Sequence, residues 1–311
     1  MAGSMIRLTW AVAMVLFAGS ACLASGQSDM HAALDAAVRT KVQSFPGKVS
    51  LAAKNLVTGE SYSLHPDDPV RTASTIKLAI MAECFFEAAE GKLELSERIK
   101  IPESEKVSGS GIVQELSTNE LPLRDLIDLM IVLSDNTATN LVLNRIGGNA
   151  VNARMKQLGF VQTRVMRKIL GDGNNLKPIP SGITEEGLKP ENKKWGIGRS
   201  SPTEMVAILD KLHRGELVSK HASEEMLTIL KRQRDHDGIG RDLKGTVIAS
   251  KSGALDRLRS DVGIIYSEGG AIAMAITVDD MPEPNWTPDN PGSLLIADLS
   301  ESLLNGLSHH H

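Results

Sequence analysis

Ser74 and Lys77 stand three positions apart at the start of a long apolar stretch of the chain. This spacing places both side chains on one face of a helix, so that a hydroxyl can lie against an amine. A serine hydroxyl is a weak nucleophile until a base takes its proton, and a lysine amine can do so once burial or a second cation lowers its pKa. The alternative is a helix-capping serine beside a solvated lysine. Ser-x-x-Lys occurs nowhere else in the chain, which makes this pair the candidate nucleophile and base.

Two further motifs carry groups that can bind a substrate or transfer a proton. Ser-Asp-Asn at 134–136 lies between two helical stretches, where a turn can direct a hydroxyl and a carboxamide into a cleft. Lys-Ser-Gly at 251–253 ends a candidate strand, where lysine offers a cation to a carboxylate and glycine lets a ligand approach. The alternatives are ordinary helix caps for the first motif and an edge strand protected by lysine for the second.

The elements that must position these motifs follow from the apolar periodicity, which is strand-like near both ends of the chain and helical in its middle. The predicted elements are a helix within 31–42, a hairpin of 48–57 and 61–64, helices at 74–91, 123–135 and 137–146, strands at 245–250, 261–266 and 271–278, and a helix at 292–303. One sheet built from both chain ends and interrupted by a helical insertion is the simplest arrangement. The site is expected in a crevice between the two parts.

Composition argues against several classes of function. Hydrophobic residues are 41%, charged residues are 23% and the net charge is -4, so neither disorder nor nucleic-acid binding is favoured. The histidines before the terminal tag are dispersed without a paired metal spacing, and Gly-x-Ser-x-Gly is absent from the sequence. A small molecule or polymer is therefore the expected substrate, with no metal.

Residues 1–26 are interpreted as tag residues followed by a secretory signal peptide. Arg7 precedes an apolar run that ends in small residues, with cleavage expected after Ala24 or Gly26. The run is too short and too rich in small residues for a stable membrane span. A lipid on Cys22 is the less favoured alternative, since the preceding Gly-Ser-Ala lacks the usual leading leucine. The mature protein is thus expected in the periplasm or outside the cell, with 308–311 as a tag remnant.

In their order and their strand or helix context, the three motifs resemble those of the class A β-lactamases and penicillin-binding proteins. The resemblance covers roughly 31–307 and includes the stretch SDNTATNLVLNRIGG. It implies an α+β (mixed α/β) fold in which helices flank an antiparallel sheet and a second lobe is all-helical. The predicted catalytic domain is 27–307, with an α/β lobe of 27–73 plus 203–307 and a helical lobe of 74–202.

The resemblance implies catalytic roles that the residue types fit. Ser74 would be the acylated nucleophile, Lys77 its base or proton relay, and Ser134 the relay to the leaving nitrogen. The backbone N–H groups of Ser74 and Ala254 would stabilise the oxyanion. Asp135 would anchor the turn. The resemblance implies no metal or organic cofactor.

The resemblance also implies how substrate is held. Asn136 would bind the side-chain amide of the substrate and help to hold Lys77. Lys251 and Ser252 would hold its carboxylate, and the strand positions of Gly253 and Ala254 would lie along it. Arg257 and Arg259 could supplement carboxylate binding, although neither stands where the family usually has its arginine. Ser-Gly-Ser-Gly at 108–111 replaces the family's aromatic gate residue.

The sequence departs from the family at the step that releases the acyl group. Class A enzymes use a loop glutamate, often in Glu-x-x-Leu-Asn, to activate the deacylating water, whereas here Ile169 or Leu170 falls near its expected place. Neither can carry a proton. The enlarged loop that ends near Ser201 offers three glutamates, each otherwise a solvated surface charge: Glu185, Glu186 and Glu191.

The predicted function is therefore a class A-like β-lactamase that opens β-lactam rings through a Ser74 acyl-enzyme. Two alternatives remain: a D-Ala-D-Ala peptidase or penicillin-binding protein with slow deacylation, and a non-catalytic β-lactam-binding homologue. The expected partners are a small-molecule β-lactam or a cell-wall peptide, with no nucleic acid, and the protein is expected to be a monomer.

Overall fold

The computed structural model describes residues 30–172, 176–177 and 182–308. The predicted signal peptide, the lipidation site at Cys22 and the C-terminal histidines lie outside these residues. The chain forms two compact units, Met1–Ser44 and Phe45–His311. The described part of the first unit is the helix 30–43, which agrees with the helix predicted within 31–42.

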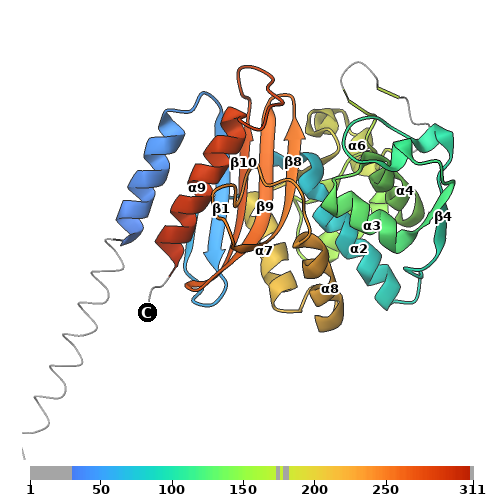
Figure 1. The fold of residues 1–311 in the computed structure, drawn as a ribbon, viewed down its shortest axis with the longest axis horizontal. Helices are drawn as coiled ribbons and strands as arrows, with labels where there is room; N and C mark the ends of the chain where they lie inside the picture. The colour runs from blue at the N-terminus through green and yellow to red at the C-terminus, as the bar shows by residue number, and fades with distance from the viewer. Residues whose placement is uncertain (1–29, 173–175, 178–181, 309–311) are drawn as a thin grey trace, which may run out of the picture. The chain divides into compact units, whose positions relative to one another are not determined.

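A five-stranded antiparallel sheet organises the second unit, with the order β2-β1-β10-β9-β8 (Figure 1). Strand β1 pairs with the hairpin strand β2 on one side and with β10, near the other end of the chain, on the other. The prediction of one sheet from both chain ends is thereby confirmed. The strands are β1 (Lys48–Asn55), β2 (Ser61–Leu64), β8 (Val247–Leu255), β9 (Leu258–Ser267) and β10 (Gly270–Asp279).

Helices cover the sheet. Strands β9 and β10 are buried along most of their length, as expected for strands with both faces covered. Helices α7 (Pro202–His213) and α9 (Pro291–Leu307) both pack on β10. Among the described residues, no helix combines the length and the apolar character needed to cross a bilayer.

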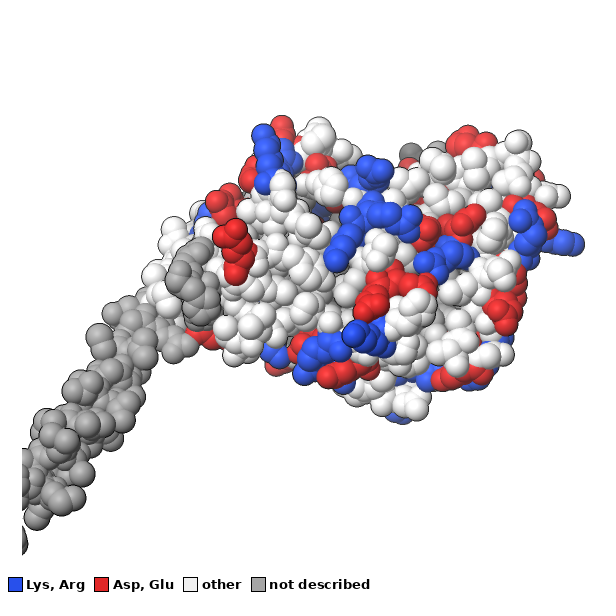
Figure 2. Space-filling view, turned by 60° about the horizontal axis from the view of Figure 1, so that its bottom comes forward, with Lys and Arg blue, Asp and Glu red and all other residues white. Residues whose placement is uncertain are grey.

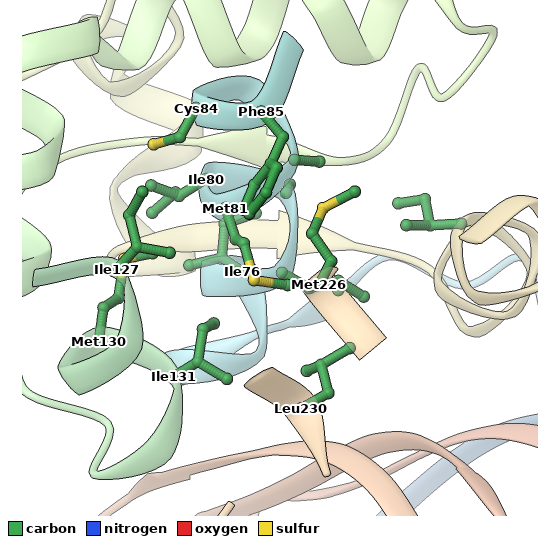
Figure 3. Packing of buried hydrophobic residues seen from close by; sticks show 14 of the residues in the cluster. Ile76, Ile80, Met81, Cys84, Phe85, Ile127, Met130, Ile131, Met226 and Leu230 are labelled. Carbon is green, nitrogen blue, oxygen red and sulfur yellow. The ribbon is translucent and has the colours of Figure 1, made fainter. Parts of the chain in front are cut away.

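The helical part of the unit is built around α2 (Lys77–Ala89). Every residue of α2 from its first to its ninth is buried, so the helix is surrounded rather than amphipathic. Its neighbours include α3 (Leu123–Val132), α4 (Asn136–Ile146), α5 (Gly148–Gln157) and α8 (Lys220–Leu230). Figure 3 shows part of this core, in which the labelled side chains are Ile76, Ile80, Met81, Cys84, Phe85, Ile127, Met130, Ile131, Met226 and Leu230.

Burial of this kind fixes the start of α2 in space. A fully buried Ile or Met side chain contributes about 1.5–3 kcal/mol relative to leaving it in water. Because buried side chains surround α2 from Lys77 to Phe85, the helix cannot slide or rotate without losing several of these contacts at once. The residues at its N-terminus therefore have a rigid support.

Shorter elements complete the unit. Two small sheets have the orders β3-β7-β6 and β4-β5. The 3-10 helix η1 precedes α2 directly. These elements are β3 (Val70–Arg71), η1 (Ala73–Ile76), β4 (Arg98–Lys100), η2 (Glu103–Glu105), η3 (Val113–Glu115), β5 (Glu120–Pro122), β6 (Arg164–Val165), α6 (Glu185–Leu188), η4 (Pro190–Trp195) and β7 (Gly198–Ser200).

Some details differ from the sequence prediction. The helix predicted at 123–135 ends at Val132, because Ser134 is left-handed and Asp135 caps the next helix. Strand β8 continues to Leu255 because its pairing with β9 extends to the turn at Leu255 and Leu258, so Lys251 lies within the strand rather than at its end. The enlarged loop that ends near Ser201 carries α6, η4 and β7. Surface charges of both signs are interspersed on the face shown in Figure 2.

Candidate active site

Ser74 lies in η1, one turn before the buried helix α2, and its side chain is half-buried. The turn is tied by Thr75, whose N–H and hydroxyl both donate to Thr72 O, at 3.1 and 2.8 Å. The residue before the serine, Ala73, has a φ of 45°, a left-handed conformation that costs a non-glycine residue about 1–3 kcal/mol. Such strain concentrates at functional sites because the surrounding structure must enforce it.

Lys77 begins α2 and is fully buried. Its Nζ lies 2.7 Å from Ser134 O, 3.2 Å from Ser134 Oγ and 3.3 Å from Asn136 Oδ1. Burial lowers the pKa of the amine well below its usual value, and the charge of Lys251 lowers it further, against a smaller opposing effect of Asp135. A lysine shifted in this way can be neutral near neutral pH and can accept a proton.

The turn that meets Lys77 is held by Asp135. Its Oδ1 accepts from Ala138 N at 2.8 Å and caps α4, while its Oδ2 accepts from Ile112 N at 2.6 Å and Val113 N at 2.8 Å. The neighbouring Ser134 has a φ of 54°, again left-handed. A buried carboxylate with three N–H partners therefore fixes the turn, in agreement with the anchoring role expected of Asp135.

The segment 108–111 packs on this turn. Asn136 Nδ2 donates to Ser108 O at 3.1 Å. A Cβ on Gly109 would lie 2.6 Å from Asn136 Nδ2, and one on Gly111 would lie 2.1 Å from Asp135 Oδ2. Both glycines also have a φ above 100°. An aromatic gate residue does not fit at either glycine, because each backbone lies directly on the side chains of the turn.

Strand β8 brings the third motif to η1. A Cβ on Gly253 would lie 2.7 Å from Thr72 O and 2.9 Å from Ser74 N, so the strand lies directly on the backbone of η1. The residue next to it, Ala254, therefore lies close to the Ser74 amide. Lys251 is fully buried, and burial lowers the pKa of its amine to about 8, against opposing effects of two aspartates.

Asp235 is a neighbour of the third motif that the sequence prediction did not include in the site. Ser252 Oγ donates to Asp235 Oδ2 at 2.7 Å and accepts from Gln233 Nε2 at 3.3 Å. The sequence Asp-His-Asp-Gly at 235–238 indicates only an exposed turn, and Asp235 is indeed exposed. Its contact with Ser252 depends on the fold, so no local pattern reveals it.

Arg259, considered as a supplementary carboxylate ligand, is used elsewhere. It is buried, and its guanidinium donates to Leu255 O and Leu258 O, both at 2.7 Å, and to Asn285 O. Its other near neighbour is the Trp286 ring, 4.8 Å away. The guanidinium therefore serves to join the β8–β9 hairpin to the loop before α9.

Ile169 is one of the two residues, with Leu170, that the sequence places near the position expected for the family's deacylating glutamate. Its side chain is buried among the apolar groups of Ile76, Ile80 and Leu143, with Arg167 nearby, and these described side chains leave no room between them for a water molecule. The three candidate glutamates of the loop have other partners or face solvent.

Glu185 is exposed, and its N–H donates to Asn149 Oδ1 at 3.0 Å. Glu186 forms an ion pair with Lys189 at 2.8 Å, and Glu191 is exposed. None of these contacts involves the residues around Ser74. By contrast, Lys77 contacts both Ser134 and Asn136, so these three predicted residues lie together.

Groups of three or more His, Cys, Asp or Glu side chains able to hold a metal are absent from the part of the chain that the structure describes.

An antiparallel sheet whose outer strand meets the start of a buried central helix is the fold of the serine β-lactamases and penicillin-binding proteins, and this chain has that fold. A family profile described as the β-lactamase enzyme family matches residues 33–307, so the chain belongs to this family. The resemblance inferred from the motifs is thereby confirmed. The chain is a hydrolase of the type that acts on β-lactams.

Individual relatives are distant but span most of the chain. β-Lactamase CARB-3 of Pseudomonas aeruginosa is 22% identical over 255 residues, covering 78% of this chain and 82% of the relative. A β-lactamase structure from Sphaerobacter thermophilus matches with a TM-score of 0.74 at 28% identity, over 88% of this chain and 96% of that chain. A variant of PBP-A in an acyl-enzyme complex with penicillin G matches with a TM-score of 0.73 at 24% identity, over 89% of this chain and 96% of that chain.

Proposed function

We propose that the protein is a class A-like β-lactamase that opens the β-lactam ring through an acyl-enzyme on Ser74. The observation that carries the proposal is the environment of Lys77. Full burial and a neighbouring cation lower the pKa of this amine, one helical turn after a half-buried serine. A buried lysine with so shifted a pKa is typical of a functional site, and activation of the serine hydroxyl is a function that suits it.

In the proposed acylation, Ser74 Oγ attacks the lactam carbonyl carbon while its proton passes to Lys77 Nζ. The N–H groups of Ser74 and Ala254 stabilise the oxyanion, an interaction whose loss typically costs about a hundredfold in rate or more. When the carbon–nitrogen bond breaks, the nitrogen takes a proton from Ser134 Oγ. Lys77 can replace that proton, because its Nζ lies 3.2 Å from Ser134 Oγ.

Substrate binding is assigned to the two motifs that flank this path. Asn136 would bind the side-chain amide of the substrate, because its Oδ1 and Nδ2 are already oriented by Lys77 and Ser108. Lys251 would supply the cation for the substrate carboxylate, with Ser252 beside it and Gly253 providing the close approach of β8 to η1.

A second candidate function is favoured by Ile169. Hydrolysis of the ester needs a positioned water and a base, and the residues expected at the place of the base, Ile169 or Leu170, cannot carry a proton. Glu185, Glu186 or Glu191 could serve only if the loop exchanged its present hydrogen bonds. A penicillin-binding protein or D-Ala-D-Ala peptidase with slow deacylation of lactams is therefore the alternative. The fold neighbour PBP-A, in a variant form, holds penicillin G as an acyl-enzyme.

We also propose that the protein is exported by its N-terminal segment and acts as a monomer. Its Arg7 and following apolar run fit a signal peptide.

Intact-protein mass spectrometry with benzylpenicillin, followed from seconds to hours, tests the proposal. An adduct that forms and clears while penicilloate accumulates would support a working β-lactamase. A persistent adduct would favour the penicillin-binding alternative. Ser74→Ala should abolish the adduct in either case. Absence of an adduct from the wild-type protein would refute Ser74 as a penicillin-reactive nucleophile and leave the non-catalytic homologue.

A further inference from the structure

Asp235 accepts a hydrogen bond from Ser252, whose hydroxyl is expected to hold a substrate carboxylate. Ser252 Oγ donates to Asp235 Oδ2 at 2.7 Å. A serine hydroxyl has a single proton to donate, so it cannot serve a substrate while it serves Asp235. An anionic substrate group must therefore displace this aspartate from Ser252 or bind without that hydroxyl.

Gln233 holds the arrangement in place. Its side chain is only 3% exposed, its Nε2 donates to Ser252 Oγ at 3.3 Å, and its Oε1 accepts from Arg234 N at 2.7 Å and Asp235 N at 3.3 Å. One buried carboxamide thus binds both the serine and the backbone of the aspartate. The contact between Ser252 and Asp235 is therefore stabilised by the buried side chain of Gln233.

Charges of both signs lie around Ser252. Lys251 is the buried cation, and Asp235 opposes the lowering of its pKa, which places the two in electrostatic contact. Asp261 is fully buried, and its pKa is raised to about 8, so it is largely neutral at neutral pH. The Arg259 guanidinium is directed at three backbone carbonyls. That guanidinium keeps its positive charge, so Asp235 is the anionic group that directly contacts the Ser252 hydroxyl, with Lys251 and Arg259 as nearby cations.

We infer that Asp235 is a specificity-determining residue at the Ser252 subsite. The quantity that it changes is the ratio of two acylation rates at Ser74, that of a substrate with a carboxamide at this subsite to that of one with a carboxylate. This ratio is higher with Asp235 present than it would be with Lys251 alone. A primary carboxamide matches both groups, because its oxygen can accept from Lys251 and its N–H can donate to Asp235. A carboxylate meets a like charge a few ångströms away, which is expected to slow acylation about tenfold. The inference rests on the proposed function of Ser74.

The test compares benzylpenicillin with its primary amide, in which the thiazolidine carboxylate is a carboxamide. Second-order acylation rates are measured by intact-protein mass spectrometry for the wild-type protein and for Asp235→Asn. The substitution should raise the rate with benzylpenicillin about tenfold, since it removes the like charge, and should leave the rate with the amide within about twofold. The ratio of the two rates is the readout, because a general loss of structure lowers both.

Asp237→Asn is the matched control. It makes the same charge change two positions away, on a residue that is half-buried and forms an ion pair with Arg241 at 3.9 Å rather than a contact with Ser252. Its ratio should equal that of the wild type. An unchanged ratio in Asp235→Asn, or an equal shift in Asp237→Asn, would overturn the inference while leaving the proposed function intact. No labelling by either compound in any of the proteins would instead refute the proposed function, and the inference with it.

Discussion

The carboxamide of Asn140 forms two hydrogen bonds with the backbone of one residue, Ile169: Nδ2 donates to Ile169 O at 2.8 Å, and Oδ1 accepts from Ile169 N at 2.9 Å. Both groups are buried. Helix α4 thereby fixes the backbone of Ile169, and the side chain is directed toward Ile76 and Ile80 at the start of α2. A carboxylate built on this fixed backbone would point at the same place, so the position itself can be tested.

Ile169→Glu is expected to draw a water into this apolar place, because a buried carboxylate needs a polar partner, and to shorten the lifetime of the penicillin adduct by about a hundredfold, the lower range for a positioned general base. Decay of the adduct after removal of free penicillin, followed by mass spectrometry, measures this lifetime. Ile169→Gln has nearly the same size without a basic oxygen and serves as the control. Equal adduct lifetimes in the two variants would show that this position cannot activate water.

Gly253→Ala is expected to lower both stability and acylation. The added methyl group would lie within 3 Å of backbone atoms of Thr72 and Ser74, so β8 and η1 must separate. Overpacking of this kind costs about 1–3 kcal/mol in the free energy of unfolding, and the separation displaces the two N–H groups assigned to the oxyanion. Urea unfolding and the rate of penicillin labelling measure the two effects.

The control for that variant is Gly59→Ala, at a turn with a φ of 82° where a Cβ meets no atom within 4 Å. It should lose stability through backbone strain alone and keep its labelling rate. Normal acylation in Gly253→Ala would contradict the proposed oxyanion site.

Asp261→Asn is expected to change how stability depends on pH. The pKa of this carboxyl is raised from 3.8 to about 8, chiefly by burial and then by the charge of Asp235. Between these values the folded protein keeps a proton that the unfolded chain has released, so this group makes stability fall as pH rises through the window. The asparagine variant should lack that fall. Unfolding free energies measured across the window provide the test, and an unaltered slope would mean that Asp261 is ionised in the folded protein.

Lys251 should impose an upper pH limit on acylation by anionic substrates. Its pKa is lowered from 10.5 to about 8, so the ammonium group is lost as the pH rises through about 8. The labelling rate with benzylpenicillin should fall through that range, whereas the rate with the neutral primary amide should fall much less. Lys251→Arg keeps its charge at these pH values and should shift the fall upward, provided that unfolding curves show it folded. A fall of equal size for both compounds would assign the titration to another group.

The parts of the fold that the sequence predicted are those with strong periodicity. The pattern of 48–64 predicted the hairpin of β1 and β2, and the unbroken apolar run after Ser74 predicted α2. These features depend on the order of residue types along the chain, which is what a sequence displays directly.

The parts that could not be predicted depend on contacts between distant segments. Asp235 lies 17 positions before Ser252, and only the folding of 233–240 over β8 brings the two together. The left-handed conformation of Ser134 has no signal in its residue type, because the three hydrogen bonds of Asp135 enforce it. Likewise, the direction in which the loop glutamates face depends on the fold: Glu186 pairs with Lys189, and Glu185 and Glu191 are exposed.

Strand β8 is the last strand of its sheet, and η1 lies against the backbone at Gly253. An outer strand presents unpaired N–H and C=O groups that can recruit another chain. The turn that carries Ser74 therefore also shields this row from intermolecular pairing. Loss of the contact, by substitution or partial unfolding, would expose the unpaired backbone of β8 and promote aggregation, so selection on solubility and selection on acylation act on the same few backbone atoms.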